Sequence, residues 1–185
     1  MRPPVIAVHE IVAALPPLDD LEATHQRETL RWLERTDDVF RRAKPATPPR
    51  HLVSYVVPVT PDGDILLVDH VNAGLWLPPG GHVDPDEHPA ATARREAREE
   101  LGVAVEVWPV FLTATRTVGL DAGHTDVSIW WVAASDRGWA VPESDEFREA
   151  RWWTPEEIAA AGETFDPHFR RFVRKLRRDL APPGA

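Results

Sequence analysis

One stretch of this chain, residues 81–103, constrains its structure and chemistry more than any other. It joins a glycine turn, an isolated carboxylate and a segment crowded with acids. Pro89 suits the first turn of a helix, where its missing N–H breaks no hydrogen bond. Gly102 suits the position just after a helix ends. The sequence therefore predicts a short helix between Pro89 and Gly102, entered from a tight turn at Gly80 and Gly81.

Three glutamates of this predicted helix follow the spacing i, i+3 and i+4, which places them on one face. They are Glu96, Glu99 and Glu100. Such like charges repel each other, by roughly a few tenths of a kcal/mol when exposed and about 3 kcal/mol when partly buried. A hard divalent cation would offset this repulsion best, and Mg²⁺ commonly links a few carboxylates to substrate phosphates. The other interpretation is a solvated glutamate-rich helix, which is common for three glutamates alone.

The complete spacing resembles the signature of the Nudix hydrolase superfamily, G-x5-E-x7-R-E-U-x-E-E-x-G-U, where U is an aliphatic residue. Every fixed position has its counterpart here: Gly81, Glu87, Arg95, Glu96, Glu99, Glu100, Gly102 and Val103. Ala97 is the one soft departure, since a larger aliphatic residue is usual there. Because the pattern is long and specific, the resemblance favours an enzyme over a solvated helix.

The resemblance implies a fold class and a reaction. The implied fold is α/β, a Nudix-type α/β/α sandwich with a mixed β-sheet. The implied reaction is hydrolysis of a phosphoanhydride bond in a nucleoside diphosphate linked to another moiety, with Mg²⁺ or Mn²⁺ as cofactor. The implied metal ligands are the Gly81 carbonyl and the carboxylates of Glu96, Glu99 and Glu100.

The same resemblance assigns catalytic roles. Arg95 and Glu87 would form an orienting pair that fixes the geometry of the metal-binding glutamates. A glutamate would remove the proton of the attacking water. Glu96 is the first candidate for this general base, and Glu99 is the second.

Further candidates for the site are expected to contact substrate: His82, His124, Asp126, Glu146 and Glu149. His124 and Asp126 are two residues apart in a strand-like stretch, so they should share one face. The other interpretation is a loop-end pair whose members satisfy each other. Glu146 and Glu149 lie in a late acidic loop, where a glutamate of Nudix proteins often reaches the metal or acts as base.

Composition and charge limit the classes of partner. The absence of cysteine excludes disulfides, thiolate chemistry and the cysteine-dependent isopentenyl-diphosphate isomerases that share the Nudix fold. No charged leader or long apolar run is present, so we expect a cytoplasmic protein that contacts no membrane. A net charge of −9 argues against a nucleic acid polymer. A small phosphorylated substrate, a nucleotide derivative, fits better. Family analogy adds the expectation of a homodimer.

The sequence leaves the substrate open. Nudix enzymes that act on ADP-ribose or dinucleoside polyphosphates carry a proline or tyrosine beyond the motif, where this chain has Val118 and Leu120. Three tryptophans could stack on a nucleobase, although a core position is favoured; they are Trp76, Trp130 and Trp131. The alternative function is a Nudix-fold nucleotide-binding or regulatory module without hydrolysis, but such modules normally have eroded glutamates.

Two parts are expected along the chain. Residues 1–50 should form an N-terminal helical extension with a proline-rich linker, and residues 51–181 the Nudix hydrolase domain. Within the first part, residues 5–15 fit a helix or a strand, and a helix is expected from Asp19 to about Arg42. The linker, residues 44–50, has three prolines, which oppose both helix and sheet pairing.

The second part is expected to alternate strands with helices. The expected strands are 51–59, 64–70, 76–77, 104–115, 123–133 and 150–153, the first two forming a hairpin. A capping box at Thr154 and Glu157 should begin a helix. The last helix, 166–180, has an apolar stripe opposite a basic face that includes Arg171 and Lys175, and we expect the basic face to be solvated.

Overall fold

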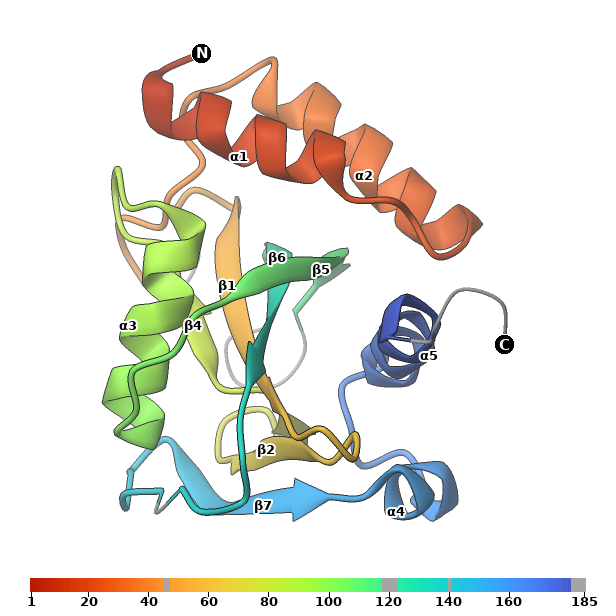
Figure 1. Ribbon diagram of the computed structural model, residues 1–185. Helices are drawn as coiled ribbons and strands as arrows, with labels where there is room; N and C mark the ends of the chain where they lie inside the picture. Colours follow the sequence, from red (N-terminus) through yellow and green to blue (C-terminus); the bar gives the residue numbers. More distant parts are fainter. Residues whose placement is uncertain (45–46, 118–122, 140, 181–185) are drawn as a thin grey trace.

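The computed structural model describes residues 1–44, 47–117, 123–139 and 141–180. A mixed β-sheet lies between two layers of helices, which is the predicted α/β/α sandwich (Figure 1). The helices are α1 (Pro3–Ala14), α2 (Asp20–Leu33), α3 (Pro89–Leu101), α4 (Pro155–Ala160) and α5 (Phe169–Leu180). The strands are β1 (Arg50–Val59), β2 (Ile65–His70), β3 (Leu75–Leu77), β4 (Gly80–His82), β5 (Trp108–Arg116), β6 (Thr125–Ala134) and β7 (Phe147–Trp153).

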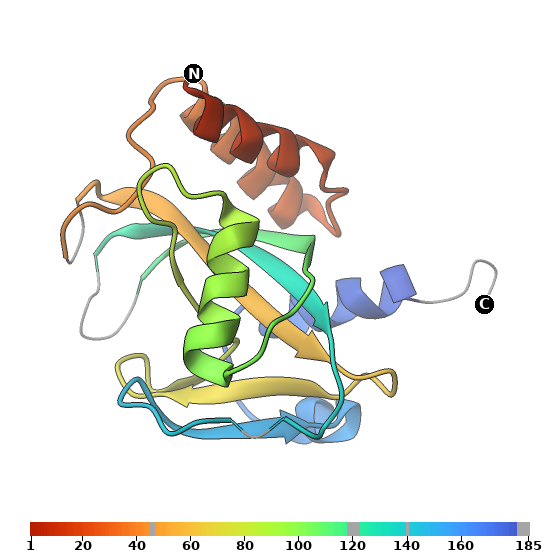
Figure 2. The ribbon, with the colours of Figure 1, turned by 60° about the vertical axis from the view of Figure 1, so that its left-hand side comes forward.

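The centre of the sheet is the parallel pair β1 and β6. The strand order is β3-β2-β1-β6-β5, with β4 also paired to β1 and β7 to β2. All the other pairs are antiparallel, which makes the sheet mixed. Val59 faces Ile65 across the turn between β1 and β2, so the predicted hairpin is confirmed. Figure 2 shows α3 crossing the long strand β1.

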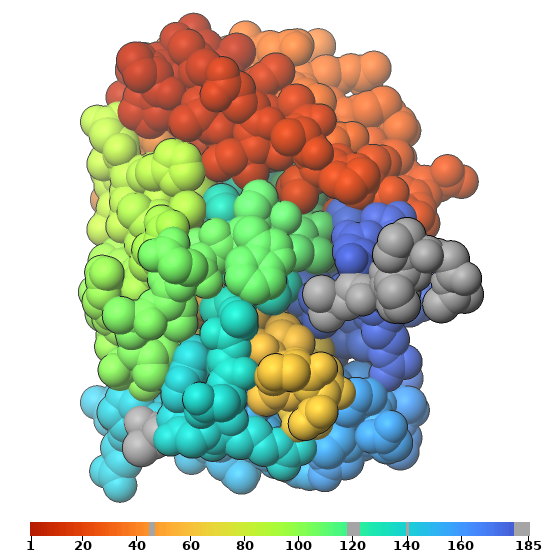
Figure 3. Space-filling model, viewed as in Figure 1, coloured from red at the N-terminus to blue at the C-terminus, as the bar shows by residue number. Residues whose placement is uncertain are grey.

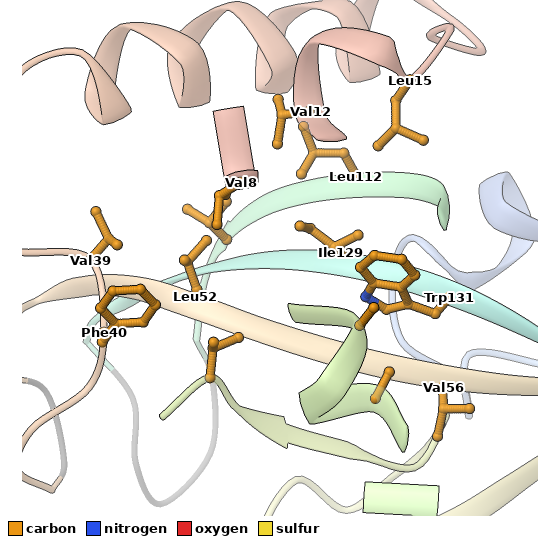
Figure 4. Close-up of a cluster of buried hydrophobic side chains, with 14 of the residues drawn as sticks. Val8, Val12, Leu15, Val39, Phe40, Leu52, Val56, Leu112, Ile129 and Trp131 are labelled. Atoms are coloured by element: carbon orange, nitrogen blue, oxygen red, sulfur yellow. The ribbon is translucent and has the colours of Figure 1, made fainter. Parts of the chain in front are cut away.

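One face of the sheet is covered by α1, α2 and α3 together. Val8 and Val12 of α1 belong to the same buried cluster as Leu112 and Ile129 of the sheet (Figure 4). The side of α3 that meets the sheet consists mainly of small residues, which lets the helix lie close to it. These buried residues are Ala90, Ala93, Ala97 and Leu101. The N-terminal helices therefore extend the layer to which α3 belongs.

The opposite face is covered by α4 and α5 with a second, aromatic cluster. Phe169 and Phe172 of α5 pack near Phe111 and Trp130 of the sheet. The Trp130 indole N–H donates to Thr113 Oγ1 at 3.2 Å, which satisfies its one donor. Trp131 is buried on the other face. The favoured prediction, that Trp130 and Trp131 are core residues, is therefore confirmed.

A buried ion pair joins the N-terminal helices to α5. The side chain of Lys175 is 0% exposed, and its Nζ lies 2.6 Å from Glu22 Oε1 of α2. The same oxygen accepts from the Leu112 backbone N–H at 3.1 Å, and Oε2 accepts from that of Leu18 at 2.7 Å. In the space-filling view, the N-terminal helices lie directly against the rest of the molecule (Figure 3).

The prediction of a solvated basic face on the last helix is therefore wrong for two of its members. Lys175 is buried against Glu22, and Arg171 is bound to Asp19 through two hydrogen bonds. The Arg171 guanidinium lowers the pKa of Asp19 to about 2. The error arose because helical periodicity shows which residues share a face, but not what packs against that face. Here carboxylates at the start of α2, far away in the sequence, pair with the basic residues.

Two element boundaries differ clearly from expectation, and one element left open is now assigned. The helix expected to reach Arg42 ends at Leu33, and beyond it the Thr36 hydroxyl accepts from the Asp38 backbone N–H in a local turn. Residues 5–15, open between helix and strand, are helical in α1. The strand expected from residue 104 begins at Trp108. Among the described residues, no helix is long and apolar enough to cross a membrane.

Candidate active site

A cavity of about 580 Å³ opens where α3, β4 and the ends of β1 and β6 meet. Most of the predicted site residues line it: Gly81, His82, Arg95, Glu96, Glu99, Glu100, His124, Asp126 and Glu146. Glu87 stands behind Arg95, and Glu149 lies elsewhere. The structure thus gathers residues from four separate segments around one space.

The helix that carries the glutamates has the ends expected from its sequence. Pro89 occupies the first turn, and the His88 side chain accepts from the Ala90 backbone N–H at 3.1 Å. Gly102 adopts φ 70°, a left-handed conformation that glycine adopts without strain, and its N–H bonds to the Arg98 carbonyl. These two ends set where α3 begins and where it stops.

Gly81 of β4 lies close to the Glu96 side chain of α3. A Cβ atom built on Gly81 would lie 2.8 Å from Glu96 Cδ and closer still to Glu96 Oε1. The absence of a side chain therefore provides the space that the Glu96 carboxylate occupies. A similar clash with Ser54 and Tyr55 of β1 explains the neighbouring Gly80.

Replacing Gly81 by alanine should displace the Glu96 carboxylate and lower hydrolytic activity by roughly 10- to 100-fold, the range typical for misplaced metal-site geometry. The comparison is kcat/KM at saturating Mg²⁺ for wild type and variant. Gly162→Ala is the matched control, because a Cβ there has nothing within 4 Å and Gly162 does not have a left-handed backbone conformation. Full activity in Gly81→Ala would show that the close approach has no catalytic use.

Two of the three glutamates are buried and carry raised pKa values. Burial raises the pKa of Glu96 to about 7, against the opposing effect of Arg95. Burial and the neighbouring Glu96 raise the pKa of Glu100 to about 8. Glu100 Oε1 accepts from the Gly80 backbone N–H at 2.9 Å, which aims it toward β4. Glu99 differs, because its side chain is 58% exposed at the rim.

Arg95 and Glu87 form the pair that the sequence resemblance implies. Arg95 Nη2 lies 3.1 Å from Glu87 Oε2, and Nε lies 3.2 Å from Oε1. From this anchor, Arg95 Nη1 donates to Glu96 Oε1 at 2.6 Å and to Glu99 Oε2 at 3.1 Å. Glu87 is itself held by the Thr92 hydroxyl at 2.7 Å. The bonds to Glu87 therefore hold the Arg95 guanidinium in the position from which it also contacts Glu96 and Glu99.

His82, His124 and Asp126 lie on the wall of the cavity beside these acids. Asp126 Oδ1 is 3.2 Å from His124 Nε2 and also 3.2 Å from Nε2 of a histidine absent from the predicted set, His51. Burial lowers the pKa of His82 to about 3, with Arg41 adding to the effect, so this imidazole is neutral at pH 7. The sequence gives no sign that His51 belongs to the site, because it lies at the start of an ordinary strand pattern.

Glu146 and Glu149, the two candidates predicted in the late acidic loop, lie in different places. Glu146 lines the cavity and acts with burial to raise the pKa of both Glu96 and Glu100. Glu149 lies on β7 and lines a separate depression with Trp139 and Trp152. The geometry therefore gives no support to a substrate contact by Glu149. Val118 and Leu120, which stand where some Nudix enzymes have a proline or tyrosine, are outside the described residues.

Other residues of the cavity wall have no local sequence signal. Three are basic: Arg41, Lys44 and Arg116. Tyr55 of β1 supplies an aromatic side chain to the same wall, edge-on to Trp130 at 5.3 Å between ring centroids. Trp76, considered for base stacking, instead packs against Trp153. Only the folded chain brings residues 41, 44 and 116 together.

The glutamate face has the donor chemistry that a hard divalent cation requires. Glu96 and Glu100 place two buried carboxyl groups and the Gly81 backbone around one space, with a third carboxylate, Glu99, at the rim. Within the described cavity the one cation in contact with Glu96 and Glu99 is Arg95, which Glu87 also binds. Oxygen donors with surplus negative charge are the donor set of a hard cation.

Comparisons with known proteins agree with this arrangement. The model of a family described as NUDIX domain matches residues 49–176. A MutT-like protein of Streptomyces ambofaciens is 32% identical over 117 residues, which are 61% of this chain and 70% of that protein. The asymmetrical bis(5'-nucleosyl)-tetraphosphatase of Mus musculus is 34% identical over 84 residues, 44% of this chain and 57% of that protein. The structure of a MutT protein from Methanosarcina mazei Go1 has a TM-score of 0.60 at 23% identity, covering 71% of this chain and 95% of that one, and it shows the shared fold.

Proposed function

The chain belongs to the Nudix hydrolase family, as the family match over residues 49–176 shows, and we propose that it hydrolyses a phosphoanhydride bond in a nucleoside diphosphate linked to another moiety. The observation that carries this proposal is the cavity in which Glu96, Glu99 and Glu100 meet Gly81. A tetraphosphatase of dinucleosides among the relatives supports a substrate with linked phosphates.

We infer that the cofactor is Mg²⁺ or Mn²⁺, held by the Gly81 carbonyl with Glu96, Glu99 and Glu100. A bound divalent cation would neutralise charge on the phosphate oxygens and acidify the attacking water. Arg95, anchored on Glu87, holds Glu96 and Glu99 in position for this role. Preset ligands matter because reorganisation during the reaction would raise the barrier.

Basic residues complete the proposed phosphate site. Arg41, Lys44 and Arg116 line the same cavity as the glutamate face, and charge-assisted hydrogen bonds from such groups bind phosphate oxygens. Glu96 remains the first candidate for the general base and Glu99 the second. Glu96 is favoured by position, since its carboxylate is confined between Arg95 and Gly81, whereas Glu99 lies at the rim.

A phosphate-release screen tests the proposed reaction. The panel comprises nucleoside triphosphates, nucleotide sugars, ADP-ribose and dinucleoside polyphosphates, each with Mg²⁺, with Mn²⁺ and with EDTA. We expect cation-dependent release, after phosphatase treatment of the products, from at least one diphosphate-linked nucleotide. Tight binding without turnover across the panel would favour the nucleotide-binding module instead.

Cation affinity should rise with pH. The folded, metal-free protein holds Glu96 and Glu100 at pKa values of about 7 and about 8, above the ordinary value of 4.5, because burial opposes their charge. Their contribution to stability is therefore full below pH 4.5 and is lost as pH rises through 7 to 8. A cation needs the ionised forms, so binding near pH 7 must release protons.

The measurement is the rise in Tm caused by Mg²⁺ at pH 6 and at pH 8.5. We expect a larger rise at pH 8.5, and calorimetric heats at pH 7 that depend on the ionisation enthalpy of the buffer. Equal Tm shifts at the two pH values would show that the carboxyl groups are already ionised in the metal-free protein.

We also infer the setting of this activity. A net charge of −9 supports a small phosphorylated substrate rather than a nucleic acid polymer. A cytoplasmic location and a homodimer stay predictions from sequence and family analogy. Light scattering of the purified full chain measures the oligomeric state directly.

A further inference from the structure

Four potential metal ligands converge beside the glutamate face, on strands that are remote in sequence. They form the histidine cluster: His51 of β1, His82 of β4, His124 just before β6, and Asp126 of β6. One ligand atom from each lies within 4.8 Å of all the others. Such a set needs an explanation, because three imidazoles and a carboxylate seldom gather in a protein interior without a common partner.

The sheet register produces this convergence. His51 faces Asp126 across the parallel pair β1 and β6. Val53, two residues after His51, faces His82 across the antiparallel pair β1 and β4. Because side chains alternate between faces along a strand, His51, Asp126 and His82 emerge on the same face. His124 is two residues before Asp126 and points the same way.

Three of the four ligand atoms of the cluster lack the hydrogen bonds that would satisfy them. Among the described residues, His51 Nε2, His82 Nε2 and Asp126 Oδ1 are buried without a hydrogen-bond partner. His51 is 0% exposed. Its Nε2 is 3.2 Å from Asp126 Oδ1, yet the two atoms do not form a hydrogen bond. Leaving such groups buried and unpaired is unfavourable, because they lose their hydrogen bonds to water without replacing them.

The second nitrogen of two rings is already oriented. His51 Nδ1 lies 2.8 Å from the Pro48 carbonyl, which can only accept, so Nδ1 carries the proton and Nε2 presents its lone pair. His124 Nδ1 lies 3.2 Å from the Thr117 hydroxyl. Hydrogen bonds of this kind, from the nitrogen that faces away from the ligand atoms, orient metal-binding histidines in proteins.

We propose that the histidine cluster is a transition-metal site that takes Zn²⁺, separate from the glutamate face. Three imidazole nitrogens and one carboxylate oxygen form a four-ligand set that Zn²⁺ accepts in tetrahedral geometry. Zn–N and Zn–O bonds of about 2.0–2.1 Å require ligand atoms about 3.3 Å apart. Asp126 Oδ1 meets this spacing to both His51 and His124. The widest pair lies within 4.8 Å, so binding requires it to close by up to about 1.5 Å.

The donor types separate the two sites. The glutamate face offers oxygen atoms alone, which suit Mg²⁺ or Mn²⁺. The histidine cluster offers mainly nitrogen, which Mg²⁺ binds poorly and Zn²⁺ binds well. A set of four protein ligands is also typical of structural zinc, so the ion joins β1, β4 and β6 where they border the cavity. This role replaces the substrate contacts predicted for His82, His124 and Asp126.

Cobalt substitution tests the site without relying on activity. The full-length protein is stripped with EDTA, exchanged into chelator-free buffer and titrated with Co²⁺ while visible absorption is recorded. We expect one equivalent to produce the intense bands of tetrahedral Co²⁺, and one equivalent of Zn²⁺ to abolish them, because Zn²⁺ binds more tightly. Zn²⁺ at excess should also raise the Tm of the stripped protein.

Two variants and two controls locate the binding. Asp126→Asn and His82→Gln each remove one ligand with little change in volume, and each should weaken Co²⁺ binding by at least about 100-fold. Glu99→Gln, on the glutamate face, and His9→Gln, on α1, should keep the tetrahedral spectrum. The proposal is overturned if wild type gives only the weak bands of six-coordinate Co²⁺, or if both ligand variants titrate like wild type. Circular dichroism of each variant verifies its fold.

Discussion

Glu99→Gln is expected to lower kcat/KM for cation-dependent hydrolysis by at least about 100-fold, the range for loss of a group that acts directly on the reacting centre. The free energy of unfolding should change by less than about 0.5 kcal/mol, as for other exposed substitutions. The Glu99 side chain is 58% exposed, and its charge partner is Arg95, 3.1 Å away, which three other acceptors also hold. Steady-state kinetics and urea unfolding of the same samples measure the two effects.

The matched control for this variant is Glu10→Gln. Glu10 is an exposed glutamate on α1, so the substitution makes the same chemical change away from the cavity. It should retain the wild-type kcat/KM. If Glu99→Gln also hydrolyses like wild type at saturating Mg²⁺, Glu99 has no catalytic or ligand role. Glu96 and Glu100 would then be the glutamates assigned to the metal and to catalysis.

Glu22→Met should lower the free energy of unfolding by about 3–5 kcal/mol, because it leaves the Lys175 ammonium buried without its partner. The variant also frees two backbone N–H groups, of Leu18 and Leu112, that now bond to the carboxylate. For a chain of this length the loss corresponds to a fall in Tm of roughly 10 °C. Denaturant unfolding gives the free energy directly.

A double-mutant cycle separates the charge from the packing. Lys175→Met alone leaves the Glu22 carboxylate buried without its partner. The double variant, Glu22→Met with Lys175→Met, removes both charges and should recover a large part of the lost free energy of unfolding. Asp38→Asn is the exposed comparison, since its pair with Arg42 lies 2.7 Å apart on the surface, and it should cost less than about 1 kcal/mol. Additive losses in the cycle would mean that the two charges do not interact.

The helix and its glutamates were predictable because their geometry is local. The spacing of Glu96, Glu99 and Glu100 fixes their common face through the helical repeat, whatever the rest of the fold. Pro89 and Gly102 fix the ends of the helix by backbone conformation alone. The hairpin of β1 and β2 followed from alternation and a turn for the same reason. The family signature, which lies within this local segment, then indicated the fold class and the reaction.

The sequence by itself thus determined the glutamate helix, the Gly81 turn, the fold class and the type of chemistry. The tertiary structure alone decided which distant residues meet them: His51 with Asp126, and Glu22 with Lys175. Those meetings depend on strand register and on the docking of α2 near α5. Register and docking are set by the burial of two hydrophobic clusters on opposite faces of the sheet. Each cluster draws its residues from many segments of the chain, so no short stretch of sequence predicts the result.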